Sequence, residues 1–163
     1  EYPDSELGRR LKLAGQMVSG DYPARILYLS QGGYDTHSNE MPSHPVLLSD
    51  LSNAISDFFA DLKLHDASDN VAMLVFTEFG RRMKDNGSGT DHGTGGVAFA
   101  LGEHVKGGIY GEYPSLDLGK LEDGGNLQHN VDFRSAYATI LERWMGMDAK
   151  PIVGGAYDQL DFI

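Results

Sequence analysis

The apolar residues of this chain recur at the spacing of helices in some segments and form continuous runs typical of buried strands in others. A spacing of three to four residues predicts an amphipathic helix over residues 5–20, with Asp4 or Ser5 as its N-cap and Gly20 as its stop. The same spacing predicts a longer helix over residues 46–65, the clearest in the chain. The apolar face of this second helix comprises Leu48, Leu51, Ile55, Phe58, Phe59 and Leu62.

Continuous apolar runs predict strands at residues 25–30, 71–76 and 97–101. The first two strands flank a helix, so we expect a right-handed βαβ unit in which they run parallel. A last helix is expected over residues 132–146, with Asp132 as its cap. These elements predict the α/β fold class, with a mostly parallel sheet flanked by helices.

Polar stretches separate these elements. Residues 81–96 contain five glycines and show no apolar periodicity, and a structureless loop of that length is usually functional or disordered. We expect this loop to cover the carboxyl ends of the strands, where α/β proteins bind their ligands. A short hairpin or edge segment is expected at residues 109–114, and a polar excursion at residues 117–130.

Composition narrows the class of protein. With 163 residues the chain is long enough to bury a core, and we expect a single domain over residues 1–163. Thirteen basic residues against 24 acidic ones give a net charge of −11, which disfavours nucleic acid and anionic membranes as partners. The absence of cysteine excludes disulfides and thiolate metal sites. Because the chain starts at Glu1 without an initiator Met, we expect it to be a processed or excised piece of a longer protein.

The candidate chemistry lies in three polar motifs, the first of which follows the strand predicted at residues 25–30. Asp35 and His37 are two residues apart, so in an extended segment their side chains project from the same side and can hold one ion. Carboxylate oxygen and imidazole nitrogen suit a borderline or hard divalent cation. The alternative is that Asp35 caps a turn and His37 bonds to nearby backbone.

The second motif, Thr-Asp91-His92-Gly-Thr, supplies a further ligand. Adjacent side chains of an extended segment point apart. We expect His92 to face the ion, because the surrounding glycines let the backbone approach closely, and Asp91 to orient it or to add a ligand. The alternative for His92 is a solvated loop histidine.

The third motif, Thr-Glu78-Phe-Gly-Arg81, follows the strand predicted at residues 71–76. A carboxylate so close to a buried strand is costly unless it is paired or bound to metal. We expect Glu78 to act as a ligand or general base and Arg81 to hold an anionic substrate oxygen. The alternative is a salt bridge from Glu78 to Arg81 or Arg82.

The remaining polar residues support weaker interpretations. Residues 85–91 superficially resemble a calcium loop, but glycine occupies the third and fifth positions and no acidic residue stands at the twelfth. A structural calcium site there stays an alternative. Four histidines have no comparable setting and are expected on the surface: His44, His65, His104 and His129.

Five long motifs, in order along nearly the whole chain, resemble the C-terminal part of DUF1501 proteins, a bacterial family of undefined function. They are YLSQGGYDTHSN, FTEFGRR, NGSGTDHGTGGVAFALG, GGIYGEYPSL and DFRSAYATILERWMG. The resemblance implies the alkaline phosphatase and sulfatase-like superfamily, whose members hydrolyse or transfer phosphate and sulfate esters at sites with one or two metal ions. It implies an alkaline phosphatase-like fold without the N-terminal part that carries the nucleophile.

By this resemblance Asp35, His37 and His92 look like the ligands of one divalent ion, zinc or manganese, with calcium as the alternative. Glu78 stands where the superfamily has the aspartate of an Asp-His pair, and Phe79 replaces that histidine, which favours a single-metal or degenerate site. The implied activity is hydrolysis of a small anionic phosphate or sulfate ester by a periplasmic or secreted protein. The alternative is a binding or scaffolding protein that retains the fold without turnover.

Overall fold

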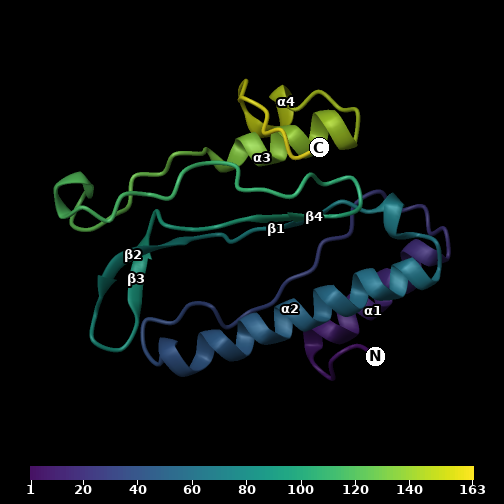
Figure 1. Cartoon of the computed structure of the whole chain (residues 1–163), viewed down its shortest axis with the longest axis horizontal. Helices are drawn as coiled ribbons and strands as arrows, with labels where there is room; N and C mark the ends of the chain where they lie inside the picture. Colours follow the sequence, from purple (N-terminus) through teal and green to yellow (C-terminus); the bar gives the residue numbers. More distant parts are fainter. The chain divides into compact units, whose positions relative to one another are not determined.

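The computed structural model describes residues 1–163, which form two compact units of mixed α and β structure (Figure 1). Unit 1 consists of Glu1–Val71 together with Asp85–Thr90, and unit 2 consists of Ala72–Lys84 together with Asp91–Ile163. The α/β class is confirmed. The expected single domain over residues 1–163 stays a prediction. The two units are interleaved in the sequence, since residues 85–90 belong to unit 1 and the residues on either side of them to unit 2.

Unit 1 is built on two helices, α1 (Glu6–Ser19) and α2 (Glu40–Leu64), which pack side by side (Figure 1). Helix α1 starts where the sequence predicts, since the Ser5 hydroxyl accepts a hydrogen bond from the backbone N–H of Gly8 at 3.0 Å, and it ends at Gly20. Neither helix is both long enough and apolar enough to cross a bilayer. Buried side chains recur at helical spacing on both helices: Leu7, Leu11 and Ala14 on α1, and Ala54, Phe58 and Leu62 on α2.

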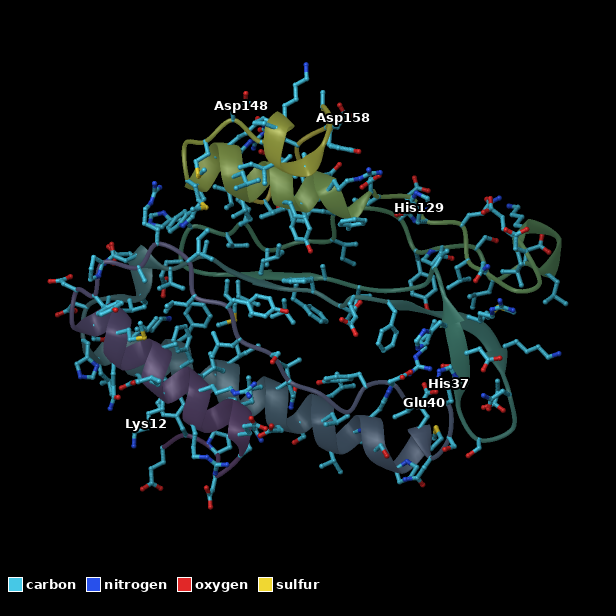
Figure 2. All side chains as sticks on the ribbon, turned by 180° about the vertical axis from the view of Figure 1, so that it is seen from behind. Lys12, His37, Glu40, His129, Asp148 and Asp158 are labelled. Atoms are coloured by element: carbon cyan, nitrogen blue, oxygen red, sulfur yellow. The ribbon has the colours of Figure 1, made fainter.

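Helix α2 begins at Glu40 rather than at the predicted Val46, close to His37 (Figure 2). Pro42 lies in the first turn, where the backbone N–H groups have no partner inside the helix, whereas Pro45 lies inside the helix and donates no backbone hydrogen bond. Ser88, distant in sequence, supplies the missing acceptors. Its hydroxyl accepts from the N–H of Asn39 at 3.0 Å, and its carbonyl accepts from the N–H of Glu40 at 3.1 Å. The local sequence carries no sign of this tertiary cap.

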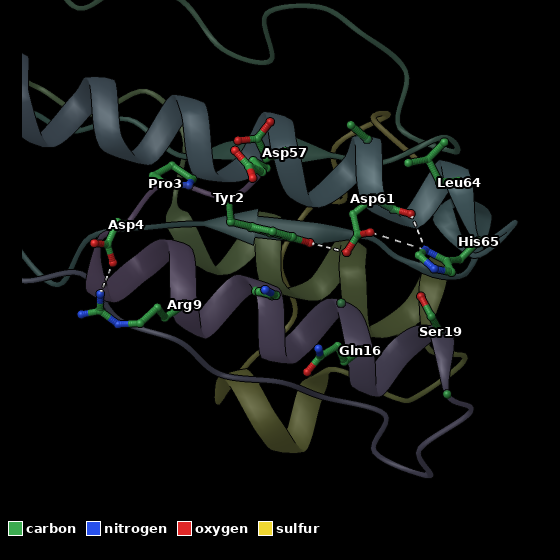
Figure 3. A pocket seen from close by; sticks show the side chains of 15 residues that line it. Tyr2, Pro3, Asp4, Arg9, Gln16, Ser19, Asp57, Asp61, Leu64 and His65 are labelled. Atoms are coloured by element: carbon green, nitrogen blue, oxygen red, sulfur yellow. Dashed lines mark hydrogen bonds and ion pairs between the residues drawn. The ribbon is translucent and has the colours of Figure 1, made fainter.

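A groove of about 780 Å³ runs along α1 and α2 (Figure 3). The Tyr2 hydroxyl donates to Asp61 Oδ2 at 2.8 Å, and burial together with this carboxylate raises the pKa of Tyr2. His65 Nδ1 lies 3.5 Å from Asp61 Oδ1 and keeps more than half of its side chain exposed, as expected of a surface histidine. The groove is therefore organised by hydrogen bonds that join the first residues of the chain to α2.

The strand predicted at residues 25–30 does not form. Its apolar side chains Ile26 and Tyr28 are 69% and 77% exposed, so the burial on both faces that stabilises a central parallel strand is missing. Without this strand there is no parallel βαβ unit, and that prediction is wrong.

The strands of unit 2 are antiparallel. Strand β1 (Met73–Val75) pairs with β4 (Phe99–Leu101), with Met73 opposite Leu101. Between them the chain runs out along β2 (Gly80–Asp85) and returns along β3 (Thr90–Gly93), which pair with each other (Figure 1). The mostly parallel sheet is therefore replaced by two small two-stranded antiparallel sheets.

A hairpin turn is the physical reason for this difference. Asn86 Oδ1 accepts from the N–H groups of Ser88 and Gly89 at 3.2 and 2.9 Å, which closes a turn around the pair Asn86–Gly87. Asn-Gly is a strong hairpin signal, and a chain that reverses through a hairpin returns antiparallel to the strand that it left. Residues 81–96 are thus mainly a hairpin and not the structureless loop that was expected.

The C-terminal part of unit 2 is helical. Helix α3 (Phe133–Thr139) continues as the π-helix η3 (Ile140–Trp144), and α4 (Lys150–Val153) follows. This confirms the helix predicted at residues 132–146, and the Tyr137 ring packs edge-on against Phe76 near the end of β1. Residues 109–114 form no hairpin. Two short 3₁₀ helices complete the chain: η1 (Ser68–Asn70) in unit 1 and η2 (Leu118–Lys120) in unit 2.

Asp132 caps α3 as predicted and offers a test of its stability. Its carboxylate accepts from Arg134 N and pairs with the Arg134 guanidinium at 2.6 Å, and these bonds lower the pKa of Asp132 from 3.8 to about 2. A lowered pKa stabilises the folded state above the unfolded value, and this contribution is lost as the pH falls through the folded value.

We expect Asp132→Ala to lower the free energy of unfolding by about 1 kcal/mol at pH 7, because the cap is lost. Asp132→Asn keeps a capping side chain but removes the charge, so its urea unfolding should depend less on pH between about 4 and 2 than that of the wild type. Identical pH dependence in the two proteins would show that the charge contributes nothing.

Candidate metal centre

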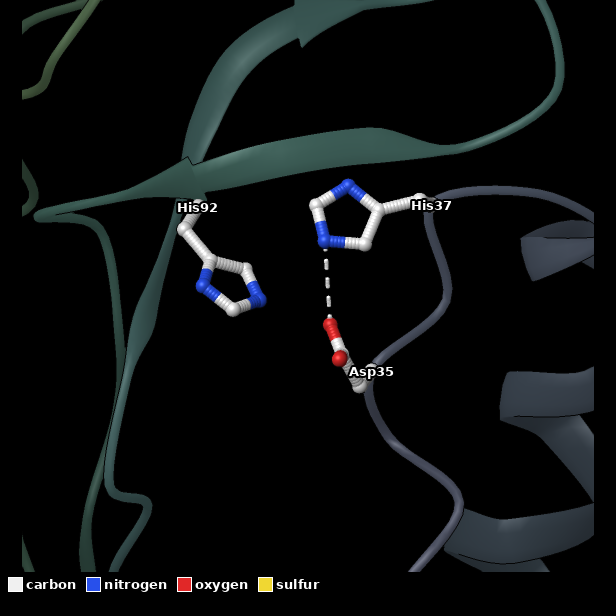
Figure 4. Close-up of side chains that lie close together, drawn as sticks. All are labelled: Asp35, His37 and His92. Carbon is white, nitrogen blue, oxygen red and sulfur yellow. Dashed lines mark ion pairs between the residues drawn. The ribbon is translucent and has the colours of Figure 1, made fainter.

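Asp35 and His37 lie in the loop that precedes α2 (Figure 4). His37 Nε2 is 3.1 Å from Asp35 Oδ1, and about half of each side chain is exposed. Two ligands of one tetrahedral zinc ion, with bonds of about 2.1 Å, lie about 3.4 Å apart. The pair therefore already has the separation that one shared ion requires.

His92 lies on β3, where its neighbours set the orientation of its ring. The imidazole stacks on the Phe79 ring, with the ring centres 4.2 Å apart and the planes 13° from parallel. The backbone carbonyl of His92 accepts from Arg82 Nε at 3.1 Å. Gly93 allows close packing of the strands, since a Cβ there would lie 2.8 Å from the carbonyl carbon of Arg81. Gly93 thus allows the two strands of the hairpin to approach closely.

The three predicted ligands form a group of side chains that could hold a metal ion. One ligand atom from each of Asp35, His37 and His92 lies within 4.8 Å of the other two, and all three residues are exposed (Figure 4). Two imidazoles and one carboxylate form a donor set typical of catalytic zinc and of related divalent metal sites that keep open positions.

The hairpin tip, residues 86–89 between β2 and β3, contacts the loop that carries Asp35 and His37. The Asn86 amide donates to the carbonyl oxygen of His37 at 3.0 Å. Gly89 packs so closely on this loop that a Cβ there would overlap the carbonyl oxygen of Thr36. Because the tip continues directly into β3, the strand that carries His92 starts from this packed segment.

A sequence model described as "Protein of unknown function (DUF1501)" matches residues 5–159 of the chain. The chain belongs to the DUF1501 family. No curated protein and no solved structure gave a significant match. The match spans all three polar motifs and confirms the family suggested by them, but DUF1501 membership assigns no activity.

The other predicted site residues of this DUF1501 chain lie outside the group of three. Glu78 and Asp91 are not part of it, and their roles stay predictions. The Arg81 guanidinium lies 5.1 Å from the centre of the Phe79 ring, the same ring that stacks on His92. Arg81 is therefore near one of the ligands, and its role as an anion-binding residue stays a prediction.

The polar residues at 85–91 shape a turn in the DUF1501 chain. Asp85 Oδ1 accepts from the N–H of Gly87 at 2.6 Å, and Asn86 Oδ1 accepts from two further backbone N–H groups. Oxygens that accept backbone hydrogen bonds in a tight turn are less available to a cation. These contacts favour the turn over the structural calcium site that was kept as an alternative.

Sequence reasoning missed a polar cluster beside the ligands. His44, expected on the surface, has a side chain only 26% exposed, and its Nε2 lies 2.8 Å from Thr36 Oγ1. Glu40 precedes His44 by four residues on α2, a spacing that places both side chains on one face of a helix. The four-residue spacing could not be used as a signal, because the helix predicted from the sequence begins only at Val46, after both residues.

Proposed function

We propose that this DUF1501 protein is a metal-dependent hydrolase of phosphate or sulfate esters, related to the alkaline phosphatases and sulfatases in fold and chemistry. The observation that supports this most is the convergence of one carboxylate and two imidazoles, from Asp35, His37 and His92. Three exposed ligands leave positions at which a substrate oxygen can bind. An ester anion suits such a site even in an acidic chain, because the ion supplies a local positive charge.

The residues around the ligands have distinct parts in this proposal. A bound divalent ion supplies Lewis acidity toward an ester oxygen. Arg81 holds a second oxygen of the anion through its forked donors. The Phe79 ring contacts both the Arg81 guanidinium and the His92 imidazole. Glu78 adds a ligand or acts as general base.

A non-catalytic binding protein is the second candidate. It is favoured by Phe79, which stands where a second-metal histidine would stand in the related phosphatases and which occupies its position as a packing residue against His92. A site for a single ion can bind an anion through the ion and Arg81 without turning it over. Activity measurements on the metal-loaded chain separate the two candidates.

The test combines metal content with turnover. We expect the purified chain to bind about one zinc or manganese ion and to hydrolyse an aryl phosphate or aryl sulfate ester in a reaction that chelation abolishes. Arg81→Ala should raise KM by about 10-fold or more, the effect of losing one charge-assisted hydrogen bond, with the metal content unchanged. Lys84→Ala, which removes a positive charge from the same strand, should change KM little and serves as the control.

Each other outcome contradicts one part of the proposal. Stoichiometric metal without ester hydrolysis would support the binding protein. A chain that retains no ion after incubation with zinc or manganese would contradict both candidates.

A further inference from the structure

Two threonines lie beside the ligands, one on each of the two chain segments that carry them. Thr36 lies between Asp35 and His37 in the loop, and Thr90 precedes His92 by two residues on β3. Neighbouring side chains of an extended segment point to opposite sides. The Thr36 hydroxyl accordingly contacts α2, while the flanking side chains face the candidate ion.

The first turns of α2 connect these two hydroxyls. Thr36 Oγ1 lies 2.8 Å from His44 Nε2, and His44 Nδ1 lies 3.6 Å from Glu40 Oε1. The Thr90 hydroxyl donates to the other carboxylate oxygen of Glu40 at 2.9 Å. With the imidazole proton on Nδ1, facing the carboxylate, Nε2 accepts from the Thr36 hydroxyl. A continuous series of polar contacts thus runs from Thr36 to Thr90.

Burial makes these contacts costly to lose. Thr36 is 8% exposed, and the side chains of Glu40 and His44 are 21% and 26% exposed. The Tyr34 ring packs on the imidazole, with the centres 5.9 Å apart. In such surroundings hydrogen bonds are stronger than in water, and a polar group left without its partner destabilises the arrangement.

Tyr34 and Gln31 also attach this loop to α2. The Tyr34 hydroxyl donates to Gln31 Oε1 at 2.8 Å, and the Gln31 amide donates to Asp50 Oδ2 at 2.9 Å. The loop is therefore attached to α2 both before and within the ligand motif. Thr90, two residues before His92 on β3, contacts the same helix through Glu40.

We infer that Thr36, His44, Glu40 and Thr90 form a relay that aligns the two ligand-bearing segments so that one divalent cation can be bound. The four are positioning residues, since they act through Asp35, His37 and His92. This inference rests on the metal site of the proposed function. It adds that residues of α2 set the affinity of the site. Glu40 accepts a hydrogen bond from Thr90, on the strand of His92, and faces His44, which contacts Thr36 in the loop of Asp35 and His37.

Cobalt(II) titration of the full chain tests the relay, because the visible spectrum of bound cobalt reports ligand geometry as well as affinity. Thr90→Val keeps the shape of the side chain but removes the hydroxyl. It should weaken cobalt binding by about 10-fold, the lower end of the range for losing a direct partner of a metal ligand, because Thr90 acts on His92 only through the backbone, and it should shift the visible absorption bands. Thr90→Ser restores the hydroxyl and should restore both. Thermal melting of each apo-protein checks that it is folded at the temperature of the titration, so that the change reflects the site and not unfolding.

Thr94→Val is the matched control. Thr94 stands two residues after His92, as Thr90 stands two before it, but its hydroxyl donates to the carbonyl oxygen of Leu127, outside the relay. Its loss should change cobalt affinity less than about 3-fold, well below the effect of losing a partner of a metal ligand. The double variant Thr36→Val/Thr90→Val should lose less affinity than the product of the two single effects, because both changes break one relay.

Three results would overturn the relay. Wild-type affinity and spectrum in Thr90→Val would do so, as would equal losses in Thr90→Val and Thr94→Val. Unchanged cobalt binding with loss of ester hydrolysis in Thr36→Val would give the Thr36 hydroxyl a direct part in turnover instead. Failure of the proposed function looks different, since the wild-type chain itself would then bind no cobalt, and the relay would fall with it.

Discussion

Replacing His37 with alanine is expected to weaken zinc binding by more than about 100-fold, because it removes one of three ligands, and loss of a partner of a ligand already costs 10- to 100-fold. His92→Ala should have an effect of similar size, since its imidazole belongs to the same group. The measurement is calorimetric titration of the apo-protein with Zn²⁺. Both side chains are exposed, so the melting temperature of the apo-protein should change little.

His129→Ala is the control for this pair, because His129 is an exposed histidine outside the ligand group. Its zinc affinity should equal that of the wild type. If His37→Ala and His129→Ala bind zinc equally well, the cluster of Asp35, His37 and His92 is not a metal site, and the proposed hydrolase loses its main support.

The second large effect is expected at Gly89 on the hairpin tip. A Cβ there would overlap the carbonyl oxygen of Thr36 and lie 2.8 Å from the carbonyl carbon of His37. These are backbone atoms, so they move only if the loop with Asp35 and His37 moves. We expect Gly89→Ala to lower the free energy of unfolding by about 1–3 kcal/mol, as overpacking does, and to weaken zinc binding by about 10-fold or more through displacement of the ligands.

Gly32→Ala is the matched control, since a Cβ at Gly32 would meet no atom within 4 Å. Neither position has a positive φ that would strain alanine, so the comparison isolates the packing of the hairpin tip. Urea unfolding and zinc titration of both variants give the two measurements. Equal behaviour of the two would mean that the tip does not hold the ligand loop in solution.

The three candidate ligands were named from the sequence, but the scaffold expected for them differs from the one in the structure. We expected Asp35, His37 and His92 to meet because the carboxyl ends of parallel strands share one edge of a sheet. In the structure Asp35 and His37 lie in a loop without a preceding strand, and His92 lies on a hairpin strand. The chemistry of the motifs and the family resemblance identified the residues, whereas the expected scaffold was wrong.

The sequence signals that were missed concern contacts between distant segments. The pair Asn86–Gly87 is a local hairpin signal, but its polar flanks lack the apolar alternation that marks strands, so the pattern predicts a loop over residues 81–96. The sequence does not show that Glu40 and His44 belong to α2, because the cap of this helix comes from Ser88, which is distant in sequence. Local patterns carry no information about such a partner.

The sequence by itself determined the helices α1 and α3, with Ser5 and Asp132 as their caps, and the kinds of side chain available to a cation. These features depend on spacing within a few residues and on the chemistry of single side chains. Only the tertiary structure decided that β1 and β4 run antiparallel, that α2 starts at Glu40, and that Thr36 and Thr90 contact the same two turns of α2. Each of these depends on hydrogen bonds between residues far apart in the chain, whose pairing no local pattern specifies.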